Sequence, residues 1–520
     1  QFAYLGRIKD KISELEIKEL ASAGMGENIL KLVNMHGRVV FDLMKYVQRN
    51  YNLDSYKLDN VAFHFTKENK LDVSPQDIFD MQKKGSSERS EIAKYCIQDC
   101  ELCNRLCKKL ECVTNNVGMA NVCSVPFSFI IGRGQGIKIL SLVAKRCRKE
   151  NFLIPPPAKK YKEEEDIEDL EGYEGAIVLK PYPGIYLETP IAVVDYGSLY
   201  PSSMIAENLS HDSIILDDKY DNLPGYEYVD VTYDNYMYVK KGAAIKKIIN
   251  KDEPTKTCRF AQFPNGEKGI IPKILMDLLK ARKETRKKIP LEPDPFKKSV
   301  LDGLQLAFKI TANSLYGQIG ARTSAIYLKD IAASTTATGR NMLNLAKDFV
   351  EQNYEGSKIV YGDTDSIFID FNPTDANGNK LKCREALIKS IEYGKEVEKN
   401  IQSLLKSPHK LEYEKCFWPF ILLSKKRYVG RKFEEDPDVS YINSMGVVSK
   451  RRDNAKIVKH VYGGILDRIM NQYDIELSKK FLQEEMMKLA RGEFPLDQLV
   501  ITKSLRGYYK VPDRIAHKVL

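Results

Sequence analysis

Residues 358–371, KIVYGDTDSIFIDF, constrain the fold more than any other stretch of this chain. Apolar and β-branched residues flank a short polar turn, which predicts two antiparallel strands joined by a tight hairpin. Three carboxylates interrupt this apolar run, at Asp363, Asp365 and Asp370. Taken alone, the first two are also typical of an ordinary surface turn. The stretch therefore predicts a hairpin and leaves the purpose of its carboxylates open.

A second carboxylate ends another apolar run, IAVVDYGSLYPSS, at Asp195. Gly197 and Ser198 then break the strand, and a helix is expected near Pro201. A carboxylate at a strand end beside a helix N-terminus can hold a cation that bridges to an anion. The N–H groups of residues 197–200 are expected to bind phosphate oxygens there.

Cations gather in the next part of the chain. Residues 273–288 hold seven cations and two anions. Two helices are predicted over residues 272–288 and 297–316, as an antiparallel helical hairpin. Lys309, Asn313 and Tyr316 share one face of the second helix, and Arg282 and Arg286 are i, i+4 neighbours on the first. These side chains form either an ordinary basic surface or a cationic clamp for a triphosphate that faces the carboxylates.

The ligand types indicate which metal such a site would take. The six histidines of the chain do not cluster, so the candidate ligands are oxygens. Oxygen ligands favour a hard cation, and phosphate chemistry favours Mg²⁺. Two ions about 3.5–4 Å apart can serve an in-line displacement at phosphorus.

The length, net charge and cysteines of the chain place further limits on its domain organisation and its environment. A chain of 520 residues is expected to form three or four domains, and its net charge of +10 is modest. Without a starting Met, we expect a piece of a longer polypeptide. Ten cysteines and no secretory signal predict a reduced, intracellular protein. Four of them, at 96, 100, 103 and 107, share one helix face; they cannot converge on one ion and are expected to be core residues.

Three motifs in order, DYGSLYPS, KITANSLYG and YGDTDS, resemble motifs A, B and C of family B DNA polymerases. YEGAIVLKPYPGIY resembles the family's link from exonuclease domain to palm, SKKRY and SKRRDNA resemble its duplex-gripping motifs, and YCIQDC resembles its third exonuclease motif. The similarity covers nearly the whole chain and is greatest to eukaryotic delta-type catalytic subunits and polymerases of large DNA viruses.

The resemblance implies a role for each matched residue. Asp195 and Asp365 would bind both metals, and Asp363 would support them. Tyr200 would lie under the sugar as the gate against a 2′-hydroxyl. The nucleotide-binding set is Ser198, Leu199, Tyr200, Arg282, Arg286, Lys309 and Asn313. The set that follows the primer–template backbone is Lys425, Lys426, Arg427, Tyr428, Arg451 and Arg452. The exonuclease remnant is Tyr95 and Asp99.

The resemblance also implies an α+β, multidomain right-hand polymerase that performs template-directed DNA synthesis in replication. We expect two Mg²⁺ ions, with Mn²⁺ as a substitute, and as partners primer–template DNA, dNTPs and a sliding clamp or accessory subunits. The expected location is a replication site in the nucleus or a viral factory. The expected divisions are 1–150 exonuclease-like, 151–175 acidic linker, 176–262 and 321–450 palm, 263–320 fingers, and 451–520 incomplete thumb.

The chain departs from the family pattern at two places. Met445-Gly446 stands where the family has Lys-Gly, which makes the duplex grip there less certain. The three other exonuclease carboxylates would lie upstream of Gln1, so we predict that this chain does not proofread. Asp99 is then equally well read as an ordinary helix-surface residue.

Three other functions are weaker fits. Reverse transcriptases and RNA-synthesising polymerases typically have adjacent aspartates in the palm hairpin, whereas here Thr364 separates two. A catalytically silent DNA-binding scaffold would be expected to lose the carboxylates that this chain keeps. A nuclease would need motifs that are mostly absent from the sequence.

Overall fold

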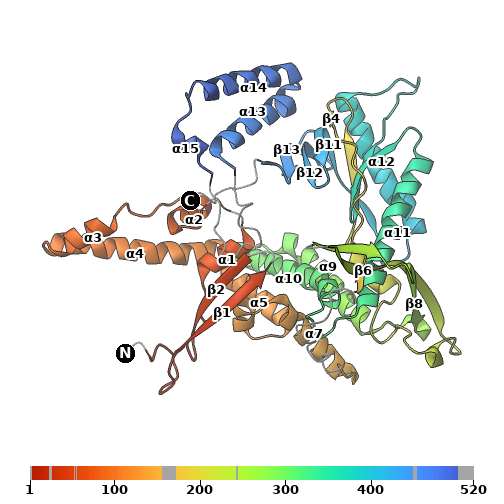
Figure 1. Ribbon diagram of the computed structural model, residues 1–520, viewed down its shortest axis with the longest axis horizontal. Coiled ribbons are helices and arrows are strands. Elements are labelled where there is room, and N and C mark those ends of the chain that lie inside the picture. Colours follow the sequence, from red (N-terminus) through yellow and green to blue (C-terminus); the bar gives the residue numbers. More distant parts are fainter. Residues whose placement is uncertain are drawn as a thin grey trace. The chain divides into compact units, whose positions relative to one another are not determined.

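The computed structural model describes residues 3–22, 26–51, 53, 55–154, 171–241, 244–448 and 454–501. It divides into two compact units (Figure 1). The first comprises Gln1–Gly134, Lys287–Ala307 and Ile501–Leu520, and the second comprises Gln135–Arg286 and Phe308–Val500. No helix in the described ranges is both long enough and apolar enough to cross a membrane.

The first unit combines one hairpin with short helices. Strands β1 (Glu14–Ser22) and β2 (Gly26–Asn34) pair antiparallel. The helices are α1 (Leu43–Asn50), α2 (Leu58–Thr66), α3 (Pro75–Gln82), α4 (Ser86–Lys109), α5 (Cys112–Cys123) and α6 (Phe127–Gly132). Leu102 and Leu106 of α4 are buried in a cluster with Val61 and Ala62 of α2.

The cysteines of α4 do not behave as predicted. Cys96 and Cys100 are exposed, and Cys103 and Cys107 are half-buried. The larger apolar side chains Leu102 and Leu106 occupy the face that packs on α2, so most of the cysteine face turns away from that core. The expectation of four core cysteines was wrong for Cys96 and Cys100.

The second unit is built on a seven-stranded, antiparallel sheet. Its strands are β4 (Gly184–Tyr186), β5 (Ile191–Tyr196), β9 (Lys358–Asp363), β10 (Ser366–Asp370), β11 (Leu411–Ser424), β12 (Arg427–Phe433) and β13 (Ser440–Met445). The order is β13-β12-β11-β5-β10-β9, with β4 also on β11. The predicted hairpin is therefore confirmed as β9–β10, and its second strand pairs with β5.

The two faces of this sheet have different partners. Alternate residues of β5, Ala192, Val194 and Tyr196, pack in the main core, which also contains residues of α11 (Lys329–Asn353) and α12 (Cys383–Ile401). Ile191 and Val193 point the other way, toward an aromatic cluster of β9–β12. Because side chains alternate along a strand, Asp195 lies on the face opposite α11 and α12.

A smaller sheet and further helices complete the described structure. β6 (Glu227–Lys241) pairs with β3 (Glu171–Tyr173), β7 (Ala244–Ile249) and β8 (Thr255–Gln262). The helices are α7 (Gln135–Glu150), α8 (Leu199–Ala206), α9 (Ile270–Lys288), α10 (Pro295–Ile319), α13 (Lys456–Gln472), α14 (Ile475–Ala490) and α15 (Leu496–Leu499). Short 3-10 turns occur at Asp218–Tyr220, Pro264–Gly266, Ile289–Leu291 and Gln402–Leu404.

Several sequence predictions agree with these elements. Helices α9 and α10 confirm the two long helices predicted over 272–288 and 297–316. Helices together with antiparallel sheets confirm the α+β class.

Candidate active site

Asp195 and Asp365 meet because of strand register. Ser366, the first residue of β10, is paired with Asp195 at the end of β5. The N–H of Tyr196 donates to the carbonyl of Asp365 at 2.8 Å. The two aspartates are thus neighbours across adjacent strands, although they are far apart in the chain. The register brings the two residues together, and the charge of Asp365 contributes to the raised pKa of Asp195.

The turn between β9 and β10 fixes the direction of Asp365. Thr364 has φ +63°, and its N–H donates to the carbonyl of Ile177 at 3.0 Å. A positive φ is unfavourable for a β-branched residue. The N–H of Asp365 donates to the Asp363 carbonyl at 2.7 Å, which tightens the turn. This compact geometry holds both aspartates at the end of a buried ribbon.

The carboxylates have unusual protonation equilibria. Burial, together with the negative charges of Asp365 and Glu414, raises the pKa of Asp195 to about 8, against the opposing effect of Lys415 and Lys309. Burial also raises the pKa of Asp365, with additional repulsion from Asp363 and Glu414. Buried like charges oppose one another's ionisation. The cluster therefore has a deficit of positive charge that a bound cation would correct.

Asp363 has a different environment. Its carboxylate pairs with the Lys426 ammonium at 2.5 and 2.8 Å and accepts from the Tyr361 hydroxyl at 3.1 Å. The Asp363 side chain is 16% exposed, while that of Lys426 is 60% exposed. Asp363 thus already has a cationic partner, which agrees with a supporting role beside Asp195 and Asp365.

Asp370 lies at the other end of β10. It pairs with Ile191 in the register that also aligns Ser366 with Asp195. Its carboxylate accepts from the N–H of Asn372 at 3.0 Å. Asp370 therefore stabilises a turn and is not part of the carboxylate pair.

The helix N-terminus beside Asp195 differs in part from expectation. Ser198 caps α8 with φ +57°. The N–H of Gly197 donates to the carbonyl of Lys410 at 3.0 Å, so the expectation that it binds phosphate was wrong. The side chain of Leu199 is 3% exposed in the main core, so Leu199 can offer a ligand its N–H but not its side chain.

Tyr200 follows directly and packs against Tyr316 of α10. Their ring centroids lie 4.6 Å apart. Burial raises the pKa of Tyr200 to about 12, with a further contribution from Asp365. The hydroxyl is therefore neutral at physiological pH and lies within electrostatic range of the carboxylate pair.

The predicted cations lie on α9 and α10. Lys309 and Asn313 are both exposed, one turn apart on α10, and Lys309 affects the pKa of Asp195. Burial lowers the pKa of Arg282, as does the nearby Arg286, while Glu412 opposes them. Glu412 is the residue of β11 paired with Asp195. Lys309 and Arg282 are thus both within electrostatic range of the carboxylate end of the sheet.

The predicted duplex-contacting residues have mixed environments. Lys425, Lys426 and Arg427 are exposed, and the Lys425 ammonium donates to the Val178 carbonyl at 2.8 Å. Tyr428 is 6% exposed, inside the aromatic cluster of the sheet. Arg451 and Arg452 lie outside the described residues.

Gly446 follows Met445, the residue at which this chain departs from the family pattern. It has φ +63°, and a Cβ there would lie 2.1 Å from the Lys426 carbonyl oxygen. Only glycine can bring the chain so close to the β11–β12 turn. The glycine of this dipeptide therefore has a structural reason that is independent of the residue before it.

Two further carboxylates were missed by the motif reasoning. Glu412 and Glu414 of β11 are exposed, and Glu414 raises the pKa of both Asp195 and Asp365. The signal was present in LEYEK, where acidic residues alternate with Leu411 and Tyr413. Such alternation is typical of a strand with one core face and one open face.

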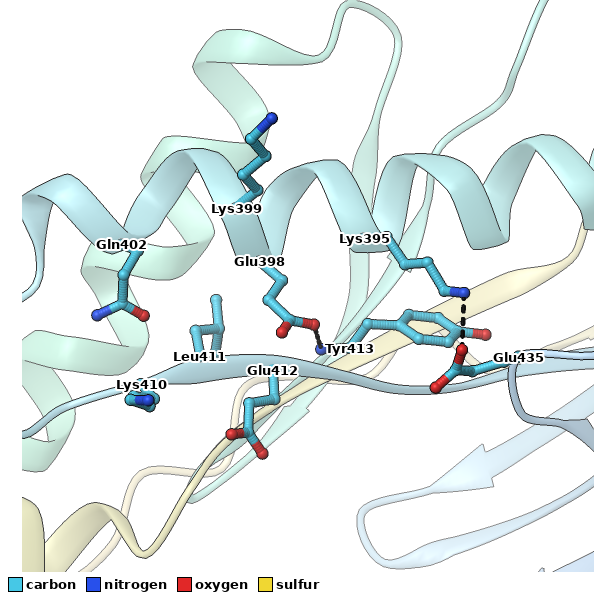
Figure 2. A pocket seen from close by; sticks show the side chains of 9 residues that line it. All are labelled: Lys395, Glu398, Lys399, Gln402, Lys410, Leu411, Glu412, Tyr413 and Glu435. Atoms are coloured by element: carbon cyan, nitrogen blue, oxygen red, sulfur yellow. Dashed lines mark hydrogen bonds and ion pairs between the residues drawn. The ribbon is translucent and has the colours of Figure 1, made fainter.

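A pocket of about 610 Å³ adjoins Glu412, between α12 and β11 (Figure 2). Two of its charged side chains form an ion pair with each other, and a third accepts a hydrogen bond from a backbone N–H. The Lys395 ammonium contacts the Glu435 carboxylate at 3.1 Å, and Glu398 accepts from the N–H of Tyr413 at 2.9 Å. The bond to Glu398 ties α12 to β11 at the wall of this pocket.

The exonuclease-like pair lies in the first unit. Asp99 forms an ion pair with Lys70 at 2.8 Å, and the same ammonium donates to the Tyr95 hydroxyl at 3.1 Å. The other oxygen of Asp99, Oδ1, is buried without a hydrogen-bond partner. Asp99 is therefore a partly buried carboxylate held by one lysine, not a free surface residue.

The residues present fit a divalent cation, but protein side chains alone do not complete its coordination shell. Within the described ranges, no three His, Cys, Asp or Glu side chains converge on one ion position. Asp195 and Asp365 offer oxygen donors whose ionised forms lack enough compensating positive charge. Mg²⁺ commonly takes one or two carboxylates and completes its shell with water and substrate phosphates. Two adjacent aspartates suit that mode of binding.

Comparison with known proteins agrees with these observations. The family described as DNA polymerase family B matches residues 125–519, and its exonuclease domain matches residues 1–61. The DNA polymerase of Pyramimonas orientalis virus is 50% identical, covering 99% of this chain and 50% of the relative. The DNA polymerase delta catalytic subunit of Dictyostelium discoideum is 36% identical, covering 97% of this chain and 42% of the relative.

The DNA polymerase of Phaeocystis pouchetii virus is 38% identical, over 76% of this chain and 48% of the relative. The chain spans about half the length of these relatives. The family match covers well over half of the chain and includes all three carboxylate and helix motifs. This chain belongs to DNA polymerase family B.

Proposed function

We propose that the protein catalyses template-directed DNA synthesis in replication. The primer 3′-oxygen forms a bond to the α-phosphorus of a dNTP, the bond to the bridging oxygen breaks, and pyrophosphate leaves. The observation that carries this proposal is the strand register that places Asp195 beside Asp365. Membership of family B supports the same reaction.

Asp195 and Asp365 are the proposed ligands of two Mg²⁺ ions, with Mn²⁺ as a substitute. When bound, such ions lower the pKa of the attacking hydroxyl and stabilise charge on the leaving pyrophosphate. The support from this chain is chemical: both ligands are oxygens, and the pair is short of positive charge. Asp363, held by Lys426, orients the turn that carries Asp365.

The incoming nucleotide is proposed to lie between α8 and the cations of α9 and α10. Arg282, Arg286 and Lys309 would neutralise the triphosphate. The N–H groups of Ser198, Leu199 and Tyr200 would complete the contacts at the helix N-terminus. Asn313, exposed one turn from Lys309, would lie beside the nucleotide, and the Tyr200 ring would exclude a 2′-hydroxyl.

The duplex is proposed to follow the β11–β12 turn. Lys425 and Arg427 are exposed there, and Arg451 and Arg452 follow in sequence. Lys426 would have to exchange Asp363 for a phosphate. Tyr428, being buried, would support the strand that presents these cations.

The domain divisions stay a proposal. They are an exonuclease-like part over 1–150, a linker over 151–175, a palm over 176–262 and 321–450, fingers over 263–320, and an incomplete thumb over 451–520. A sliding clamp or accessory subunits are proposed partners, and a nucleus or viral factory is the proposed location. The viral and delta-type names of the relatives support both proposals.

Proofreading by this chain alone is not expected. Asp99 is paired with Lys70, and one carboxylate cannot replace the set that a two-metal nuclease site needs. Mg²⁺-dependent 3′→5′ degradation of a primer by the 520-residue chain would contradict this expectation.

Primer extension tests the proposed reaction. Asp365→Asn should abolish nucleotide incorporation with Mg²⁺ and four dNTPs, because the amide cannot supply the anionic ligand. Binding to primer–template, measured by fluorescence anisotropy, should survive, because the cations that contact DNA are unchanged. Asp370→Asn is the matched control and should leave synthesis intact. Retained synthesis in Asp365→Asn would reject the assignment, and wild-type protein that binds DNA without extending it would indicate a scaffold.

A further inference from the structure

We propose that Gly339 is a positioning residue that fixes the ring of Tyr200 and thereby sets selectivity for the nucleotide sugar. This inference rests on the proposed function, in which Tyr200 separates deoxyribose from ribose. Gly339 lies inside α11, outside the three motifs that carry the family resemblance. It would act on the substrate only through Tyr200.

The geometry at Gly339 is a close approach between a helix backbone and a ring. A Cβ built at this position would lie 2.8 Å from Cε1 and 3.4 Å from Cδ1 of Tyr200, and 3.3 Å from Cδ2 of Leu199. Carbon atoms in contact normally stay about 3.5–4.0 Å apart. One edge of the Tyr200 ring therefore occupies the space that any larger residue at 339 would need.

The backbone conformation does not require glycine here. Gly339 is not among the glycines with positive φ and lies in regular helix. Glycine is among the least favourable residues in a helix interior. Alanine would suit the helix better if space allowed, so the contact with Tyr200 is the physical reason for glycine at this site.

Both the α11 backbone and the Tyr316 ring, which flank the Tyr200 ring, are held in place by other contacts. Arg340, the next residue of α11, donates to the carbonyls of Glu174 and Gly175 at 3.1 Å each, which anchors this turn of the helix. Residues 331–338 of α11, which directly precede Gly339, are buried. The Tyr316 ring packs on Tyr200 with centroids 4.6 Å apart. An added methyl group would therefore displace the Tyr200 ring sooner than the helix.

The expected effect of Gly339→Ala is a loss of fit for the correct sugar. The KM for dNTP should rise by about tenfold with a smaller change in kcat, because displacements near 1 Å can cost up to about a hundredfold. The ratio of kcat/KM for dNTP to that for rNTP should fall. The dNTP fits against the correctly placed ring and loses binding when the ring moves, whereas the rNTP is already excluded and loses less. A merely structural defect would lower the active fraction and leave this ratio unchanged.

A double-mutant cycle tests whether the substitution at Gly339 acts through the Tyr200 ring. The four proteins are wild type, Gly339→Ala, Tyr200→Ala and the double variant, each measured in primer extension with dNTP and rNTP. Tyr200→Ala alone should raise relative ribonucleotide incorporation. In the Tyr200→Ala background, Gly339→Ala should change neither KM nor the ratio, because the ring that the methyl group meets is gone. Additive effects would overturn the proposal.

The matched control is Gly463→Ala in α13, where a Cβ would have nothing within 4 Å. It should leave KM and the sugar ratio unchanged. If Gly339→Ala does not fold, the double variant should recover a folded, extending protein; its failure to do so would also overturn the inference. A wild-type protein without synthesis would reject the proposed function instead, so the two failures are distinguishable.

Discussion

Among individual residues, Asp195 has surroundings that are unusual for an aspartate. Burial beside Asp365 and Glu414 raises its pKa to about 8, whereas an aspartate in an unfolded chain titrates near 3.9. Its ionised form is therefore penalised in the free protein. A cation that binds Asp195 and Asp365 relieves that penalty, so metal affinity and local instability have the same origin.

Asp195→Asn should stabilise the metal-free protein in a pH-dependent way. Between pH 4 and 8 the folded protein holds a proton on Asp195 that the unfolded chain has released, so stability falls as pH rises through this window. Asparagine removes this titration. The advantage of the variant should grow to the order of 1 kcal/mol by pH 8, after allowance for solvent screening.

Thermal unfolding in EDTA at pH 5 and pH 8 measures this difference. The gap between the two melting temperatures should be larger at pH 8, and added Mg²⁺ should narrow it by stabilising wild type alone. Asp436→Asn, in an exposed loop, is the control and should show no such trend. A gap that is constant with pH would refute the role of burial at Asp195.

Sequence alone could identify some of these residues and not others. Asp195 and Asp365 were predictable because each interrupts an apolar strand within a recognisable motif. The occupied N–H of Gly197 was not, because its partner Lys410 lies far away in the chain. The exposure of Cys96 and Cys100 was missed for a related reason: helical periodicity defines a face but not which face packs.

At the level of secondary structure elements, the β9–β10 hairpin combines a buried ribbon with a strained turn. Thr364 takes φ +63°, which costs a β-branched residue roughly 1–2 kcal/mol. Its hydroxyl donates to Asp363 at 3.2 Å, which offsets part of that cost. Strain at the turn between Asp363 and Asp365 is consistent with a requirement to orient these side chains rather than with a requirement for stability.

Thr364→Gly should therefore raise the free energy of unfolding, by up to about 1 kcal/mol. Glycine adopts a positive φ without strain, and the N–H bond to Ile177 is kept. Urea unfolding monitored by circular dichroism is the measurement. The control is Thr255→Gly, an exposed strand position of β8, which should destabilise the protein. Equal destabilisation by both changes would show that the turn is not strained.

The long helices were predictable from periodicity and their proline boundaries, as α9 and α10 show. The sheet of β3, β6, β7 and β8 was not anticipated. Its strands carry charged residues such as Arg259 and Asp230, which form an ion pair, while alternate residues such as Val231, Tyr233 and Phe260 are buried. The alternation of buried residues in TKTCRFAQ was present in the sequence, but the charged residues between them hid it from pattern reasoning.

At the level of the whole molecule, the net charge of +10 is small, so its distribution decides what the protein binds. The exposed cations of the β11–β12 turn lie on the sheet that carries the carboxylate pair. Contacts between such cations and phosphates release counterions. The protein should therefore bind nucleic acid with a strong dependence on ionic strength.

Affinity for primer–template DNA should fall steeply between about 50 and 200 mM salt. Arg427→Ala should weaken binding at every sequence and reduce the slope of log K against log salt by about 1. Fluorescence anisotropy titrations measure both quantities. Lys389→Ala, on α12 at the opposite face of the sheet and paired with Glu392, is the control and should leave the slope unchanged. An unchanged slope in Arg427→Ala would remove this residue from the DNA-binding surface.

The pairing of β5 with β10 has a consequence for which insertions and deletions the sequence can tolerate in evolution. Asp195 and Asp365 are aligned by local main-chain bonds, so the long stretch between them can gain or lose residues without moving either one. A single-residue slip inside either strand would instead turn every side chain to the wrong side. Tolerance to insertion should thus be high in the loops and nearly absent within two short ribbons.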